Sequence, residues 1–322
     1  MPDITSQLKN LNIVVRENEP LKNHTTFQIG GPAKIYLEIS DPKKIISALK
    51  IIKEAGLNYL LLGGGSNLLV SDSGYDGVVI KIKPREIEID GEKVLVDAGY
   101  LLAGLIMKTL DAGLTGLEFE AGVPGTVGGA IKGNAGTYGE AMEQVVEKVD
   151  FINDDLTVQA FDKKQCGFKY RHSIFKEREN WLIVSAELKL AKGDTQKSRA
   201  LIEERIKYRL DTQPYGYPSA GCIFKNLIYT EEIAKRLESL DLKLSPKFKE
   251  YQKIPAAFVI ENLGLKGKTI GKAQVAEKHA NYIINLGGAT ADQVVQLISL
   301  VKQKVRDKTG IQLEEEVRYL GF

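Results

Sequence analysis

Three features of the sequence predict an α+β protein with more than one domain. The chain has 322 residues, enough for two or three domains. Within roughly the first 190 residues, segments with strand-like alternation of apolar and polar residues mix with segments of helical apolar periodicity. A stretch rich in turn-forming residues, 213–218, follows them and precedes the elements of the C-terminal part.

The N-terminal elements predict a β-α-β unit that ends in a glycine run. Alternation over 35–39 predicts a half-buried strand. An Asp-Pro pair at 41–42 supplies a helix start, apolar residues then recur on one helical face, and Gly56 ends the helix. The Tyr-Leu-Leu-Leu stretch 59–62 predicts a buried strand. Glycines 63–65 follow directly, and open α/β sheets bind ligands at the carboxyl ends of their strands.

The remaining elements follow from the same patterns. We expect strands over 78–82, 87–89, 94–96 and 181–190, with a hairpin turn at Asp90-Gly91. We expect helices over 101–112, 198–210 and 291–308, the first and last of them ended by Gly113 and Gly310. We assign residues 1–195 to a first domain and residues 196–322 to a second.

Charge and composition exclude several classes of protein. A formal net charge of +2, with both signs interspersed, gives no electrostatic footprint for nucleic acid or for an anionic membrane. No apolar run approaches the roughly 18 residues of a transmembrane helix, and the N-terminus has no signal-peptide pattern. Two cysteines make neither a disulfide framework nor a zinc site, so we expect no metal and a cytoplasmic protein with free thiols.

Two glycine-rich segments indicate a ligand. The first glycine segment covers residues 63–68, and the second glycine segment covers residues 122–136. Glycine lets main-chain N–H groups approach a bound group closely, and such groups suit phosphate oxygens, although a loop of tight turns is the alternative. Neither segment fits the Rossmann spacing, and the chain has no Walker A motif. We therefore expect a dinucleotide bound in some other fold, or a nucleotide sugar.

Further motifs accompany the two glycine segments. They are 23–31 (NHTTFQIGG), 170–175 (YRHSIF), 219–226 (SAGCIFKN), 271–275 (GKAQV), 278–281 (KHAN) and 313–318 (LEEEVR). In this set and order, over roughly residues 21–321, the chain resembles the UDP-N-acetylenolpyruvoylglucosamine reductases. That family acts in bacterial peptidoglycan precursor synthesis and hence in cell-wall formation, cell shape and division.

The resemblance implies a fold and a cofactor. The fold is a two-lobed vanillyl-alcohol-oxidase-type FAD-binding domain followed by a smaller α/β substrate domain. No extra tyrosine-bearing loop occurs in the third region of this fold, the substrate domain that follows the two lobes. The absence of this loop is typical of the type II form. The implied FAD-binding residues are Gly63, Gly64, Gly65, Ser66, Asn67, Leu68, Gly122, Pro124, Gly125, Gly128, Gly129, Ala130, Asn134, Ala135, Gly136 and Arg318.

The resemblance also implies a reaction. NADPH reduces FAD, and hydride then passes from flavin N5 to the enolpyruvyl group of a UDP-sugar, giving UDP-N-acetylmuramate. Arg171 matches the family's active-site arginine, whose fixed charge and forked donors suit a carboxylate that gains enolate character. Glu316 matches a second catalytic position. The implied substrate-binding residues are Tyr170, Lys225, Asn226, Gln274 and His279. The expected partner is this small molecule alone, and the expected state is a monomer.

The chain departs from the family pattern at the expected proton donor. Cys222 stands where the best-known members carry serine, and a thiol, with an unperturbed pKa of about 8.5, is a far better acid than an alcohol. Glu315 replaces the proline usual before Glu316, and the stretch 239–253 is longer than usual.

Two other functions stay open from the residues. One is an FAD-dependent oxidase of the same fold, which would usually hold FAD covalently through His or Cys; neither glycine segment contains such a residue. The other is a non-catalytic flavin or nucleotide-sugar binding protein, against which the retention of Arg171 and Glu316 argues.

Overall fold

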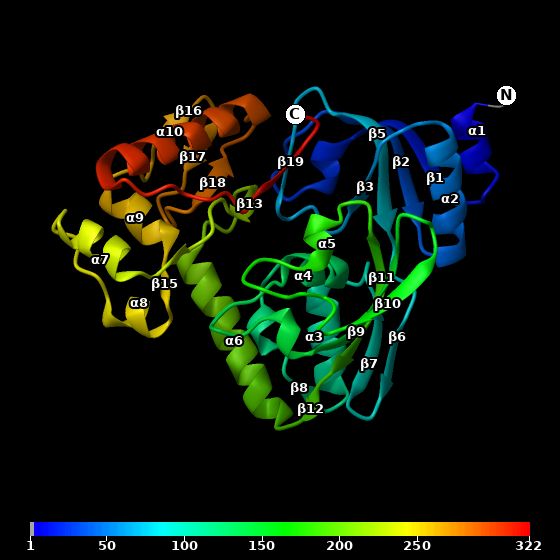
Figure 1. The fold of residues 1–322 in the computed structure, drawn as a ribbon, viewed down its shortest axis with the longest axis horizontal. Coiled ribbons are helices and arrows are strands. Elements are labelled where there is room, and N and C mark those ends of the chain that lie inside the picture. The colour runs from blue at the N-terminus through cyan, green and yellow to red at the C-terminus, as the bar shows by residue number, and fades with distance from the viewer. Residues whose placement is uncertain (1–2) are drawn as a thin grey trace. The chain divides into compact units, whose positions relative to one another are not determined.

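A computed structural model describes residues 3–322, which form two compact units (Figure 1). Unit 1 contains the chain up to Glu19, Pro32–Gly64 and Tyr75–Arg209. Unit 2 contains Pro20–Gly31, Gly65–Gly74 and Leu210–Phe322.

This division differs from the predicted domains, 1–195 and 196–322. Most of helix α6 (Thr195–Thr212) belongs to unit 1, because Ile202 lies in its core and Arg205 pairs with Glu140. Two N-terminal segments belong to unit 2. One of them contains β4 (Leu68–Val70), which pairs in parallel with the C-terminal strand β19 (Arg318–Leu320), a long-range pairing that local patterns do not reveal.

The first sheet of unit 1 has the order β1-β2-β5-β3. Its strands are β1 (Val14–Pro20), β2 (Pro32–Ile39), β5 (Tyr75–Ile82) and β3 (Tyr59–Leu62), with β5 parallel to both β2 and β3. Helix α2 (Pro42–Glu54) joins β2 to β3. Its N-cap is Asp41, whose carboxylate accepts from Lys43 N at 2.9 Å. The helix packs in one core with α1 (Ile4–Lys9) and the sheet. The β-α-β prediction is confirmed.

The burial predicted for strand β3 is wrong. Only Leu62 is fully buried, and the other three residues are half-buried. The reason is topological: β3 is the edge strand, because β5 takes the place between it and β2.

The second sheet of unit 1 is antiparallel and has the order β10-β9-β11-β7-β6. It contains β6 (Ile87–Asp90), β7 (Lys93–Asp97), β9 (Val146–Ile152), β10 (Val158–Asp162) and β11 (Leu182–Lys189). Helices α3 (Leu102–Asp111) and α4 (Val127–Gly133) pack into its core, and α5 (Ile174–Glu177) lies against α4. A short ladder joins β8 (Leu114–Thr115) to β12 (Ala191–Lys192). The predicted hairpin at Asp90-Gly91 and the strands beside it are confirmed.

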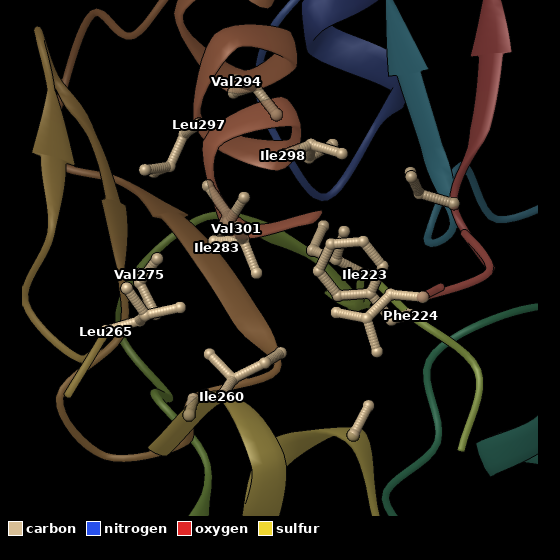
Figure 2. Packing of buried hydrophobic residues seen from close by; sticks show 14 of the residues in the cluster. Ile223, Phe224, Ile260, Leu265, Val275, Ile283, Val294, Leu297, Ile298 and Val301 are labelled. Atoms are coloured by element: carbon tan, nitrogen blue, oxygen red, sulfur yellow. The ribbon is translucent and has the colours of Figure 1, made fainter. Parts of the chain in front are cut away.

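Unit 2 is built on a sheet of order β13-β18-β17-β16, formed by β13 (Ser219–Cys222), β18 (Tyr282–Asn285), β17 (Ala273–Val275) and β16 (Thr269–Ile270). Helices α9 (Ala256–Asn262) and α10 (Ala291–Thr309) pack on one core with it. Figure 2 shows Ile223, Val275, Ile283 and the α10 side chains in this core.

The remaining elements of unit 2 are short. They are β14 (Leu227–Ile228), β15 (Lys253–Ile254), α7 (Glu231–Glu238) and α8 (Pro246–Glu250), and the stretch 239–253 contains α8. The helix predicted over 291–308 is confirmed: Thr290 and Gln293 form a capping box, and Gly310 ends the helix at φ +69°. No helix within residues 3–322 combines the length and apolarity needed to cross a bilayer.

Candidate active site

The two glycine segments touch each other in unit 1. A Cβ atom on Gly64 would lie 2.8 Å from the Cα atom of Gly125, and one on Gly63 would lie 2.8 Å from the Thr126 hydroxyl oxygen. The side chain of Lys81 donates to the carbonyl oxygen of Gly63 and fixes the end of β3. The two segments therefore form one continuous main-chain surface without room for side chains between them.

This packing gives a second reason for the glycines. The sequence suggests that they allow a ligand to approach, and several are also required because protein atoms lie where a Cβ would be. A Cβ on Gly128 would lie 2.8 Å from the Cβ of Ala98, and one on Gly136 would lie 2.2 Å from the carbonyl oxygen of Glu140. In unit 2, a Cβ on Gly65 would lie 2.1 Å from the carbonyl oxygen of His24. Gly129 by contrast is exposed.

Half of the second glycine segment is a helix. Thr126 is the N-cap of α4 and its hydroxyl accepts from Gly129 N at 3.4 Å. Asn134 ends the helix in the left-handed conformation at φ +43°, which asparagine tolerates better than most residues. The four glycines Gly122, Gly125, Gly128 and Gly129 thus lie before or in the first turn of a short helix.

The end of α4 positions the Tyr170-Arg171 turn. The Asn134 side chain donates to Lys169 O at 3.0 Å and accepts from Glu143 N at 3.0 Å. Lys169 and His172 exchange two main-chain hydrogen bonds, so Tyr170 and Arg171 occupy the centre of a tight turn. Three of the residues predicted from distant motifs, Asn134, Tyr170 and Arg171, are therefore brought together.

Arg171 is held in a strained conformation. Its φ is +55°, which costs a residue other than glycine about 1 kcal/mol or more. Its Nη1 donates to Gly136 O at 3.0 Å, and Lys176 Nζ donates to its carbonyl oxygen at 3.0 Å. The guanidinium also lies over the Tyr170 ring, 5.4 Å from the centroid. Several contacts thus fix this side chain beside the second glycine segment.

Sequence reasoning missed Glu120, which lies just before that segment. It is fully buried, and burial raises its pKa to about 7 against the opposing effect of Arg171 and Arg209. The only signal in the sequence is an acidic residue within an otherwise apolar and small-residue stretch, 119–123.

In unit 2, residues 65–68 run beside the C-terminal segment that carries Glu316 and Arg318. Asn67 Nδ2 donates to Glu316 O at 3.0 Å, and Arg318 N donates to Asn67 O at 3.1 Å. Leu68 then pairs with Arg318 in the parallel β4–β19 ladder. The first glycine segment is therefore hydrogen-bonded to a predicted catalytic residue.

Cys222 and Glu316 lie on neighbouring segments of the chain. Cys222 ends β13 and is half-buried, and the next residue, Ile223, accepts from Glu316 N at 2.8 Å. Asn281 strengthens this arrangement, because its buried amide accepts from Phe224 N at 2.9 Å and donates to Phe224 O at 2.8 Å. Asn281 lies in a recognised motif, but its structural role follows only from the folded chain.

The predicted substrate-binding residues also lie in unit 2, except Tyr170. Lys225 Nζ pairs with the exposed Glu314 carboxylate, and Asn226 Oδ1 accepts from Ala256 N at 3.3 Å. Gln274 Nε2 donates to Gly267 O at 3.4 Å. His279 accepts from Asn281 N at 3.3 Å, and burial lowers its pKa, so the ring is neutral at pH 7.

The glycine segments fit a phosphate-bearing cofactor such as FAD. Between them they contain no acidic residue and one lysine, Lys132. Gly64 packs on Gly125, and Gly63 packs on the Thr126 hydroxyl. The three glycines leave their main-chain groups uncovered by Cβ atoms, which suits phosphate oxygens. In the part of the chain from residue 3 to residue 322, no group of three His, Cys, Asp or Glu side chains is arranged to hold a metal ion.

Comparison with known families agrees with this chemistry. The profile described as "FAD binding domain" matches residues 33–161. The profile described as "UDP-N-acetylenolpyruvoylglucosamine reductase, C-terminal domain" matches residues 213–320. The second match begins close to the start of the C-terminal part of unit 2.

Similar proteins span the whole chain. The UDP-N-acetylenolpyruvoylglucosamine reductase of Carboxydothermus hydrogenoformans is 39% identical over 97% of this chain and 96% of its own. That of Anoxybacillus flavithermus is 36% identical over 100% and 99%. The crystal structure of the Thermus caldophilus reductase superposes with a TM-score of 0.74 at 30% identity, covering 96% of this chain and 98% of that one. The chain belongs to the UDP-N-acetylenolpyruvoylglucosamine reductase family.

Proposed function

We propose that this protein is an FAD-dependent oxidoreductase that reduces the enolpyruvyl group of UDP-N-acetylglucosamine enolpyruvate to give UDP-N-acetylmuramate, with NADPH as the hydride source. The observation that supports this most strongly is the full-length similarity to reductases of that name, over both the FAD-binding and the C-terminal region. The absence of a tyrosine-bearing insertion from the third region supports the type II form.

FAD would be held by the two glycine segments, and when bound it carries hydride from NADPH to the substrate. The residues that would bind FAD are the sixteen that the resemblance implies, the first of them Gly63 and the last Arg318. Their side chains are small or neutral apart from Arg318, which lies beside Asn67. The positive charge of Arg318 suits an anionic cofactor.

Arg171 would bind the substrate carboxylate. Hydride addition to the terminal carbon of the enolpyruvyl group places negative charge on the adjacent carboxylate system, and a guanidinium stabilises that charge through two parallel N–H donors. Its fixed backbone and its contact with Gly136 O hold it ready before the reaction, which is the property that electrostatic catalysis requires.

Cys222 would give the proton that completes the reduction. A thiol with an ordinary pKa near 8.5 keeps its proton at neutral pH and releases it more readily than an alcohol. One proton and one hydride add across the double bond, and the thiolate recovers its proton from solvent. Glu316 would orient this donor; its main-chain N–H donates to the carbonyl oxygen of Ile223, the residue after Cys222.

The two half-reactions test these roles separately. We expect NADPH to bleach the flavin of both the wild type and Cys222→Ala under anaerobic conditions, whereas only the wild type should be reoxidised by the UDP-enolpyruvyl sugar. Cys222→Ser should keep partial activity, because an alcohol is a weaker acid in the same place. Loss of both half-reactions in Cys222→Ala would show that Cys222 is structural, and a colourless protein that takes up no FAD would refute the proposed function.

We further propose that the enzyme is a cytoplasmic monomer whose only partners are small molecules. Neither Cys166 nor Cys222 forms a disulfide in the described residues, which agrees with a reducing compartment. Light scattering coupled to gel filtration would test the monomer, and a dimer at micromolar concentration would contradict it.

A further inference from the structure

Unit 1 contains a buried carboxyl group that the proposed mechanism does not use. Glu120 ends the 3-10 turn Glu118–Glu120 and is 0% exposed. Within residues 3–322, neither of its carboxylate oxygens has a hydrogen-bond partner. Burying an ionised carboxylate costs several kcal/mol unless charges or hydrogen bonds offset the loss of hydration. The ionised form of Glu120 therefore depends on positive charge nearby.

Two guanidinium groups supply it. Hydrogen bonds tie both to the neighbours of Glu120 in the chain. Arg209 Nε donates to Ala121 O at 2.9 Å. Arg171 Nη1 donates to Gly136 O at 3.0 Å, and the next residue, Thr137, donates its hydroxyl to Phe119 O. The positive charges of Arg171 and Arg209 favour the ionised form of Glu120. The other charged groups nearby are engaged or exposed. On α3, which packs against the turn, Lys108 and Asp111 are exposed. On the turn itself, the Glu118 carboxylate accepts from Gly116 N at 2.8 Å.

The two arginines have different tasks. Arg209 is buried on α6, and its Nε donates to Ala121 O at 2.9 Å, so it anchors the main chain next to Glu120. Arg171 is the cation that the proposed function assigns to the substrate carboxylate. Glu120 therefore lies in the field of the group that must bind an anion during catalysis.

We propose that Glu120 is a positioning residue for Arg171. The Glu120 carboxylate attracts the Arg171 guanidinium before substrate arrives, and it takes up one proton from solvent when the substrate carboxylate binds. This inference rests on the proposed role of Arg171. Two carboxylates that share one guanidinium do not both stay ionised readily, because each raises the pKa of the other. Protonation of Glu120 is the easier change, since burial already places its pKa near neutrality.

Proton uptake on ligand binding tests the proposal. The probe is UDP-N-acetylmuramate, the product, which keeps the carboxylate, titrated calorimetrically into oxidised holoenzyme at pH 8 in buffers of different ionisation enthalpy. We expect the wild type to take up close to one proton per bound ligand and Glu120→Gln to take up none. Above pH 7 the Kd of the wild type should rise up to tenfold per pH unit, and that of Glu120→Gln should stay flat.

A matched control and a second variant complete the design. Glu118→Gln, on the same turn, should keep the wild-type uptake and pH dependence, because its side chain is bonded to Gly116 N and not to the site. Glu120→Ala should behave as Glu120→Gln, and it replaces that variant if the amide prevents folding.

The outcomes separate this inference from the proposed function. Ligand binding with the same proton uptake in wild type and Glu120 variants would overturn the inference and leave the proposed function standing. So would a uniform loss of affinity with an unchanged pH dependence, which would mark Glu120 as purely structural, or a wild type whose Kd does not change above pH 7. A wild type that does not bind UDP-N-acetylmuramate at all would overturn both.

Discussion

Glu120→Gln should change how the stability of unit 1 depends on pH. The folded protein raises the pKa of Glu120 from 4.5 to about 7, so the folded state prefers the neutral acid. In the unfolded chain the carboxyl ionises at its ordinary pKa. The wild type is therefore fully stabilised by this group below pH 4.5 and loses that contribution as pH rises to about 7. Glutamine does not titrate, so the variant lacks this loss.

The size of the effect follows from the two pKa values. A difference of one in pKa corresponds to about 1.4 kcal/mol, so the full loss is about 3 kcal/mol, of which about 2.5 kcal/mol falls between pH 5 and pH 8. Relative to the wild type, Glu120→Gln should thus gain about 2.5 kcal/mol in free energy of unfolding over this interval. Any constant cost of burying the amide cancels in the comparison between the two pH values.

The chain offers a local probe for this measurement. Its single tryptophan, Trp181, stacks on Phe151 in the core of unit 1, with ring centroids 4.7 Å apart. Tryptophan fluorescence during urea unfolding of the holoenzyme therefore follows the unit that contains Glu120. The control Glu118→Gln should show a pH dependence like that of the wild type. Parallel curves of unfolding free energy against pH for wild type and Glu120→Gln between pH 5 and pH 8 would refute the reasoning. They would mean that the pKa of Glu120 is the same in the folded and the unfolded state.

Three further experiments should give defined results. Gly64→Ala should lose about 1–3 kcal/mol of stability and weaken FAD binding, because the added Cβ would meet the main chain of Gly125. Its control, Gly133→Ala, has open space for the Cβ and should be neutral or slightly stabilising; the temperature at which flavin is released on heating distinguishes the two variants. Asn281→Ala should cost about 2–4 kcal/mol because it leaves two buried main-chain groups unpaired, and an unchanged melting temperature would contradict this. Native protein should react with one equivalent of a thiol reagent, at half-buried Cys222, because Cys166 is fully buried and burial raises its pKa to about 12; two equivalents would count against the structure.

The secondary structure was largely predictable because it depends on local patterns. Apolar periodicity, caps and terminal glycines located α2, α3 and α10 and the strands around them. Strand order was not predictable in this way, since the insertion of β5 between β2 and β3 depends on packing between distant segments. The density of glycines likewise indicated that other atoms come close to the main chain, but not whether these atoms belong to a ligand or to the protein. The folded chain shows that most of the approach is between the two glycine segments and their own neighbours, with the ligand surface as a consequence.

The three adjacent glutamates show where sequence reasoning about a site reaches its limit. Glu314 is exposed and pairs with Lys225, whereas the half-buried Glu315 accepts from Lys302 Nζ at 2.5 Å. Glu316 is fixed through its main chain by Ile223 and Asn67. A motif selects Glu316 from this run, but only the hydrogen bonds explain why neighbours of identical chemistry differ. Glu120 is the converse case: no motif selects it, yet burial raises its pKa to about 7 against the opposing effect of two guanidiniums. For a carboxyl group, environment decides the chemistry, so acids outside a motif need the same scrutiny as acids within one.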